Sequence, residues 1–336
     1  MNAPAKNFPP VNRPDATDLD TLSIKPTREF EVCNHLLDDH DALEEFYGQN
    51  GYLFFRNVLD PQSVEEARDS MLAIAADEYG LVEKGDITGK WTGKAYPPGS
   101  EEKPIFAGLS KRLISYPENQ KVLSKILGEA PSMVPIVQYR IYPPNGPVTM
   151  VHQDGFYSPG IQDYKPLWIP LTPCPREMGG LTIAVGQNRR GYFHNVGKTA
   201  PFPIPDDLIE SDSWATIDYE PGDLLVVHPY SPHAGMPNTT DRLRVTFDTR
   251  VQSARNPTTF EATVDSVTDN SITVTSPDEN VGTVTLSVDR ETYLRPRDPG
   301  IKEKFEELTQ VTTPGMRLCV VREGNRASML RFGSRP

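Results

Sequence analysis

The sequence has few cysteines, no long apolar run and no basic cluster, and each shortage excludes a class of protein. Its three cysteines, at positions 33, 174 and 319, form no CxxC pair, which argues against a disulfide framework or a zinc knuckle and for a reducing cytoplasm. No apolar run approaches the roughly 18 residues of a membrane-spanning helix. The net charge of −12 comes without clustered Lys and Arg, so no nucleic-acid-binding surface is expected. We therefore expect a cytoplasmic protein whose partners include neither nucleic acid nor a membrane.

The abundance of proline, 33 residues, favours loops and short strands over long helices. Apolar spacing nevertheless predicts helices over residues 38–51, 60–79 and 116–127, with an aromatic strand over 52–58 between the first two. Residues 81–110 are polar and glycine-rich. A segment of this length is either a lid over a site or an ordered surface loop.

The middle of the chain reads as a succession of short strands with Pro and Gly between them. Such spacing favours a β-sandwich or barrel. The strands are expected over residues 134–142, 166–172, 180–185, 215–219, 223–228 and 244–252.

The pattern changes near Pro257, after which Thr and Val alternate around Asn or Gly turns. A short helix from 302 to 308 and a last strand, RLCVVRE, follow. We therefore divide the chain into an N-terminal arm (1–37), a main domain (38–257) and a small β-rich C-terminal region (258–336). The last region contains no histidine, so it cannot supply an imidazole ligand.

Two of the six histidines lie in contexts suited to metal binding. In MVHQDG, His152 and Asp154 are two residues apart, and an extended strand would place both side chains on one face. A second imidazole from a distant strand would complete a two-His-one-carboxylate triad, which leaves positions open and suits iron(II) oxygenases. Alone, HxD is a weak signal.

The second imidazole is expected from PGDLLVVHPYSPHAGMPNTTDRLRVTF. His228 and His233 are both candidates. The strand after them carries Arg242 and Arg244, and a guanidinium holds a carboxylate in a bidentate manner that a lysine does not reproduce.

The combined segments FYGQNGYLFFRNVLDP, VQYRIYPP, MVHQD, PLWIPLT and GGLTIAVGQNRR, with the stretch H-x4-N-x5-R, cover roughly residues 40–252. Together they resemble the phytanoyl-CoA dioxygenase family of iron(II)/2-oxoglutarate oxygenases. The resemblance implies a mainly β fold with flanking helices, around a double-stranded β-helix (jelly-roll, cupin-like) core, to which this chain adds its C-terminal β-rich appendage.

Position by position, the resemblance implies roles for six residues. His152, Asp154 and His233 would be the metal ligands and the catalytic centre. The arginine eleven residues after the distal histidine binds the far carboxylate of 2-oxoglutarate in the family, which selects Arg244 here and His233 over His228. Gln138 and Trp168 would lie beside the co-substrate.

The sequence departs from the family at two points. Val185-Gly186-Gln187-Asn188 replaces the usual Pro-Gly-Ser-His turn, and Gly235 stands where a serine is common. The first departure affects a turn near the substrate; the second removes a hydroxyl near the co-substrate, which a nearby Thr or Tyr could replace.

The resemblance implies an enzyme that uses Fe(II), 2-oxoglutarate and dioxygen to hydroxylate an unactivated C–H bond of a small-molecule, natural-product-like substrate. Succinate and carbon dioxide would be released. The alternative from the residues alone is a cupin-type metal-dependent enzyme or binding protein that is not an oxygenase. The C-terminal region could form a homodimer, cover the site or stabilise the fold.

Overall fold

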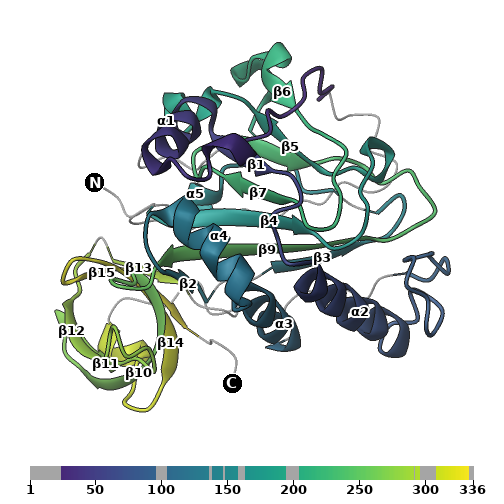
Figure 1. The fold of residues 1–336 in the computed structure, drawn as a ribbon. Helices are drawn as coiled ribbons and strands as arrows, with labels where there is room; N and C mark the ends of the chain where they lie inside the picture. The colour runs from purple at the N-terminus through teal and green to yellow at the C-terminus, as the bar shows by residue number, and fades with distance from the viewer. Residues whose placement is uncertain are drawn as a thin grey trace.

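The fold combines helices with several antiparallel sheets and ends in a small C-terminal barrel (Figure 1). It is a computed structural model that describes residues 24–95, 104–135, 138–146, 148–157, 163–193, 204–290, 292–295 and 308–332. Among these, no helix is both long and apolar enough to cross a membrane.

The largest sheet before the barrel is antiparallel, in the order β1-β7-β4-β9-β2, with β3 also paired to β9. The central strand β9 is ten residues long, so it holds β4 along one edge and β2 and β3 in succession along the other. The strands are β1 (Tyr52–Phe55), β2 (Pro131–Met133), β3 (Gln138–Tyr142), β4 (Lys165–Pro170), β7 (Leu224–Val227) and β9 (Arg244–Ser253).

Alternate side chains divide β9 between two environments. Val245, Phe247 and Val251 pack into the main hydrophobic core, whereas Arg244 and Arg250 line a pocket on the opposite face. The same alternation places Ile169 of β4 in the core and Trp168 at the pocket. Because successive side chains of a strand point to opposite faces, the core residues and the pocket residues of these strands alternate.

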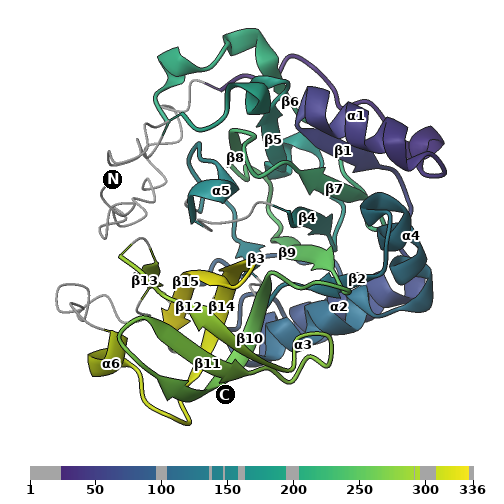
Figure 2. The same cartoon turned by 90° about the vertical axis from the view of Figure 1, so that its left-hand side faces the viewer.

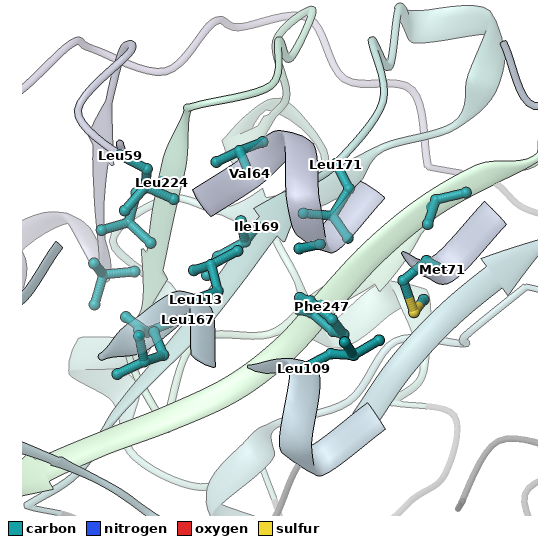
Figure 3. Close-up of a cluster of buried hydrophobic side chains, with 14 of the residues drawn as sticks. Leu59, Val64, Met71, Leu109, Leu113, Leu167, Ile169, Leu171, Leu224 and Phe247 are labelled. Atoms are coloured by element: carbon teal, nitrogen blue, oxygen red, sulfur yellow. The ribbon is translucent and has the colours of Figure 1, made fainter. Parts of the chain in front are cut away.

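Helices cover the core face of this sheet (Figure 2). Side chains from the sheet meet Val64, Met71, Leu109 and Leu113 there, and Figure 3 labels four of them: Leu167, Ile169, Leu224 and Phe247. The helices are α1 (His40–Asn50), α2 (Pro61–Asp77), α3 (Pro104–Ile114) and α4 (Pro117–Leu127).

Caps explain two of the helix boundaries. The side chain of Asp39 accepts a hydrogen bond from the Ala42 N–H at the start of α1, and that of Asp60 accepts one from the Ser63 N–H at the start of α2. Gly51 ends α1 with a φ of 81°, a conformation that favours glycine.

A smaller sheet, in the order β6-β5-β8, lies on the other side of the pocket. Its strands are β5 (Leu181–Ala184), β6 (Trp214–Ala215) and β8 (His233–Gly235). Ile183 and Ala215 share a hydrophobic cluster with Phe54, Trp168 and Leu225 of the large sheet, so the two sheets pack face to face. Short helical turns lie nearby: α5 (Asp154–Tyr157) and the 3-10 turns Asn34–Leu36, Arg176–Met178, Gln187–Arg190, Asp206–Leu208 and Ser211–Ser213.

The C-terminal region forms a closed ring of five strands with its own core. β10, β11, β12, β15 and β14 pair in that circular order, and β13 pairs in parallel with the later part of β15. Ile272, Val274, Leu318 and Leu330 are fully buried inside it. The elements are β10 (Thr259–Val267), β11 (Ser271–Thr275), β12 (Thr283–Ser287), β13 (Tyr293–Arg295), α6 (Leu308–Val311), β14 (Arg317–Glu323) and β15 (Arg326–Phe332).

Several sequence expectations need correction. Residues 104–114 form helix α3 with buried Leu109 and Leu113, so the second part of the candidate lid belongs to the core. The strand RLCVVRE is not the last one, because β15 follows and closes the barrel. The helix expected over 302–308 lies outside the described residues except for its last position, where α6 begins.

The segment before α1 also packs into the hydrophobic cluster between the two sheets. Phe30 packs with Tyr52 and Tyr219, with ring centroids 4.7 and 6.3 Å away. Val32 forms a parallel bridge with Phe54. Residues 24–37 are therefore part of the packed structure.

Candidate functional site

Three side chains that could hold a metal ion come together between the two sheets. One ligand atom from each of His152, Asp154 and His233 lies within 4.8 Å of the others. The Asp154 Oδ1 atom lies 3.8 Å from His152 Nε2 and 3.9 Å from His233 Nε2. Two imidazoles and one carboxylate grouped this way match the donor set of a facial triad, which suits iron(II).

The two imidazoles are oriented by their own loops. His233 lies on β8 and forms an isolated bridge with His152. The Nδ1 atom of His152 lies 2.7 Å from the Met150 carbonyl, and that of His233 lies 2.9 Å from the Ser231 carbonyl. Each Nδ1 must carry the proton to donate this bond, so each Nε2 keeps a lone pair for a metal.

Asp154 is placed differently from the sequence expectation. His152 makes a single bridge, and Asp154 is already the first residue of the helical turn α5, so the pair does not share one face of a regular strand. Gln153, between them, is 2% exposed. Its amide donates to the carbonyls of Gly191 and Tyr230 and accepts from the Phe193 N–H, which fixes the turn that brings Asp154 back to the histidines.

Sequence reasoning missed Arg250, the charged partner of Asp154. The Nη2 atom of Arg250 lies 3.2 Å from Asp154 Oδ2. The other carboxylate oxygen, Oδ1, is the one that lies near the two histidine Nε2 atoms. Burial, the largest single influence, lowers the pKa of Arg250, but Asp154, Tyr164 and Asp248 together raise it by more, so the net shift is upward. Alternation from Arg244 along β9 (244, 246, 248, 250) could have indicated that this arginine faces the site.

Arg244 lies at the other end of the pocket and is 3% exposed. Its guanidinium carbon lies 4.1 Å from the centre of the Tyr142 ring, and its Nη1 donates to the Met236 carbonyl at 3.3 Å. Its Nε has no hydrogen-bond partner among the described residues. Arg242, the alternative candidate, precedes β9 and is turned to the surface, where it pairs with Asp241.

A hydroxyl pair lies where the family serine is missing. Tyr142 Oη and Thr149 Oγ1 are 2.7 Å apart, and both residues line the pocket beside Gly235 and Arg244. A Cβ added to Gly235 would lie 3.5 Å from Arg244 Nη2, so glycine leaves this side of the guanidinium open.

The remaining expected residues are placed as follows. Trp168 lines the pocket, and its ring centroid lies 4.5 Å from that of Tyr219. The backbone of Gln138 pairs with Asp248 on β3 and β9, while its side chain lies outside the described ones. The complete pocket lining is Tyr142, Thr149, His152, Asp154, Pro166, Leu167, Trp168, Leu181, Val227, His233, Gly235, Arg244, Asp248, Thr249 and Arg250.

His228 lies outside the cluster. Its ring packs against Tyr47 and Tyr230, with centroids 5.0 and 5.4 Å away. Its Nδ1 accepts a hydrogen bond from the Tyr230 N–H. Burial and the nearby Lys165 ammonium lower its pKa from 6.5 to about 4. The structure therefore gives His228 a packing role and leaves His233 beside Asp154.

Arg189 and Arg190 lie on the 3-10 turn Gln187–Arg190. Arg190 donates to Gln187 and to the Leu208 carbonyl. Neither arginine is among the residues that line the metal-ligand pocket.

Comparison with known proteins gives consistent matches. The model of the phytanoyl-CoA dioxygenase family matches residues 47–246. The chain is 30% identical over 251 residues to the 1-deoxypentalenic acid 11-beta-hydroxylase of Streptomyces arenae, covering 70% of this chain and 88% of that protein. The enzyme of the same description from Streptomyces exfoliatus is 30% identical over 266 residues, which are 72% of this chain and 90% of that one.

Among solved structures, the fold is similar to the non-heme alpha ketoglutarate dependent epimerase SnoN from nogalamycin biosynthesis. The TM-score is 0.48 at 20% identity, over 65% of this chain and 85% of that one. The non-heme monooxygenase ThoJ gives 0.45 at 20% identity, over 71% and 85%.

Proposed function

We propose that His152, Asp154 and His233 hold the iron of this protein. The chain belongs to the phytanoyl-CoA dioxygenase family and is a non-haem iron(II)/2-oxoglutarate-dependent oxygenase. The observation that carries this assignment is the convergence of the three ligand atoms within 4.8 Å. Both histidines present Nε2 to the shared position because their Nδ1 atoms are engaged by backbone carbonyls.

We further propose that Arg244 binds the far carboxylate of 2-oxoglutarate. A buried guanidinium needs an anionic or well-placed polar partner, and the described residues leave its Nε without one. Tyr142 and Thr149, next to Arg244, replace the missing serine as hydroxyl donors. Trp168 contributes an apolar wall to the same cavity, and Gln138 is assigned to the co-substrate because its strand, β3, is paired with β9.

The proposed reaction is hydroxylation of an unactivated C–H bond in a small, natural-product-like molecule. When bound, iron(II) and 2-oxoglutarate supply the oxidation of that bond by dioxygen, with release of succinate and carbon dioxide. The protein's part is to orient the target and exclude water, for which Leu167, Leu181 and Val227 provide apolar walls. The Streptomyces relatives, described as hydroxylases of 1-deoxypentalenic acid, support this reaction type.

We assign the paired antiparallel sheets to a double-stranded β-helix, or jelly-roll, because the triad lies between two sheets that pack face to face. The oxygenase domain then spans residues 38–257 together with the packed segment 24–37. Residues 258–336 form a separate β-rich region.

Anaerobic titration tests the central assignment. Wild-type protein with iron(II) is titrated with 2-oxoglutarate, and the visible charge-transfer band of the chelate is expected to develop to a one-to-one end point. No band from wild-type protein would contradict the assignment. Substrate-dependent succinate release, with 1-deoxypentalenic acid as the first probe, then tests the reaction class.

A further inference from the structure

The pocket face of β9 carries two buried arginines at its two ends. Arg244 and Arg250 are 3% and 6% exposed, and both line the pocket that contains the three candidate ligands. Six residues of strand separate their Cα atoms by about 20 Å, so the two long side chains enter one cavity from opposite ends. Arg244 has a proposed ligand. Arg250 contacts Asp154 and lies beside the Tyr164 ring, with its guanidinium carbon 5.8 Å from the ring centre, and no ligand has been assigned to it.

Arg250 has donors to spare. Its Nη2 contacts Asp154 Oδ2 at 3.2 Å, while its Nε and Nη1 atoms are buried without a hydrogen-bond partner among the described residues. Leaving a buried donor without a hydrogen-bond partner is unfavourable, and more so when the donor is charged. Two such donors on one guanidinium beside a pocket indicate that a ligand completes them.

The two carboxylate oxygens of Asp154 have different neighbours, and these indicate where the ligand would lie. Oδ1 is the oxygen nearest both histidine Nε2 atoms, and Oδ2 is the oxygen held by Arg250. The guanidinium therefore sits directly behind the metal-binding carboxylate. An anion that reaches its remaining N–H groups would also be next to the metal.

Formal charges indicate the kind of ligand. Iron(II) and the two arginines bring four positive charges, and Asp154 and Asp248, which both line the pocket, bring two negative ones. The difference, 4 − 2, is two uncompensated positive charges in a buried site. A dianion removes this imbalance, whereas a neutral molecule leaves it in place.

We propose that Arg250 is a second carboxylate-binding residue, which holds the 2-oxo-acid end of the co-substrate while it fixes the outer oxygen of Asp154. This inference rests on the proposed function. Arg244 holds the opposite end of the molecule. The arrangement makes 2-oxoglutarate span the two ends of one strand face, with one arginine for each carboxylate.

Two probes separate the two arginines. 2-Oxoglutarate has both carboxylates, and 2-oxobutyrate has only the one next to the keto group. Anaerobic iron(II) enzyme is titrated with each probe, and the dissociation constant is read from the charge-transfer band. Arg250→Lys keeps the charge but loses the planar fork, and is expected to weaken both probes to the same extent, by about 10-fold or more.

The matched variants define the contrast. Arg244→Lys is expected to weaken 2-oxoglutarate and leave 2-oxobutyrate at the wild-type value. Arg242→Lys, on the exposed arginine just before β9, is expected to change neither. Arg250→Lys with wild-type constants for both probes, or with a loss confined to 2-oxoglutarate, would overturn the inference. Absence of the band in wild-type protein would instead overturn the proposed function.

A crystal structure of wild-type protein with iron(II) and 2-oxoglutarate gives a second readout that needs no variant. Arg250 Nε and Nη1 are expected within hydrogen-bond distance of the keto-proximal carboxylate. A bound co-substrate that leaves both atoms without contact would refute the assignment, including the case in which Arg250→Lys does not fold.

Discussion

The peptide groups of His152 and His233 are hydrogen-bonded to each other in both directions, with each N–H donating to the other's carbonyl at 3.0 Å. The spacing of the two imidazoles is therefore set by the backbone. The turn that carries Asp154 is fixed by Gln153, and Arg250 contacts the Asp154 carboxylate. The carboxylate and the histidine pair are thus positioned by independent means, and substitutions should separate their contributions.

Asp154→Asn is expected to lower iron(II) affinity by more than about 10-fold, because an amide replaces the anionic ligand. It should also destabilise the iron-free protein by about 3 kcal/mol, since it leaves the Arg250 charge buried without its counterion. Metal titration and urea unfolding of iron-free protein measure the two effects. Asp241→Asn, on an exposed carboxylate, is the control. Unchanged stability would mean that Arg250 is compensated elsewhere.

Arg244→Ala is expected to raise the KM for 2-oxoglutarate by about 100-fold, because a charge-assisted bidentate contact contributes about 1.5–3 kcal/mol. Iron binding should be preserved, since the contacts of Arg244 described above are with the Met236 carbonyl and the Tyr142 ring. Steady-state kinetics with varied co-substrate, alongside iron titration, provides the measurement. Full co-substrate affinity in the variant would remove Arg244 from its role and leave the triad intact.

Gly179→Ala is expected to damage the Arg244 end of the pocket from a distance. Gly179 has a φ of 73°, and a Cβ there would collide with the backbone carbonyls of Met236 and Pro237. The Met236 carbonyl accepts the Arg244 hydrogen bond, so the shift should lower both stability and co-substrate affinity. Gly85→Ala, also at positive φ but in open space, should cost only about 1 kcal/mol of stability. Equal effects of the two substitutions on affinity would contradict this account.

The pH dependence of stability should report on His228. Its folded pKa of about 4 lies below the ordinary 6.5, so the unfolded chain takes up the proton first as the pH falls. The stabilisation is complete above pH 6.5 and is lost as the pH falls towards 4, by up to about 3 kcal/mol. Lys165 lowers the pKa and Glu44 opposes it. Urea unfolding of wild type and His228→Gln across this window should differ in slope; parallel curves would exclude His228.

The grouping of His152, Asp154 and His233, which the structure brings together, could be predicted from the sequence because HxD and the distant His233 belong to a recognisable set of segments. The helical turn at Asp154 could not, because it depends on Gln153 reaching carbonyls at positions 191 and 230. The contacts of Gln153 are long-range, and a local pattern does not contain them. Closure of the barrel by β12 and β15 escaped prediction for the same reason.

Arg250 is a different kind of miss. The alternation in RVTFDTRVQ places it on the Arg244 face of β9, so the sequence did contain the signal. The family resemblance, by contrast, selects Arg244 and gives no role to Arg250. The sequence does not predict helix α3, because its apolar residues follow a long polar segment whose composition favours a loop.

The family match ends at residue 246, in the middle of β9. A shortened protein, or a chimera joined at that point, would retain Arg244 and lose Arg250. A junction just after Arg250 would also break the hydrogen bonds of Gln252. Its side chain accepts from the N–H groups of Thr258 and Thr259 and donates to the Thr259 carbonyl. These hydrogen bonds connect β9, the last strand of the site, to the start of β10, the first strand of the barrel. Chimeras of this enzyme and its relatives should therefore fold and bind only when the junction lies beyond Thr259. The start of the barrel and the active site would then have to be inherited together.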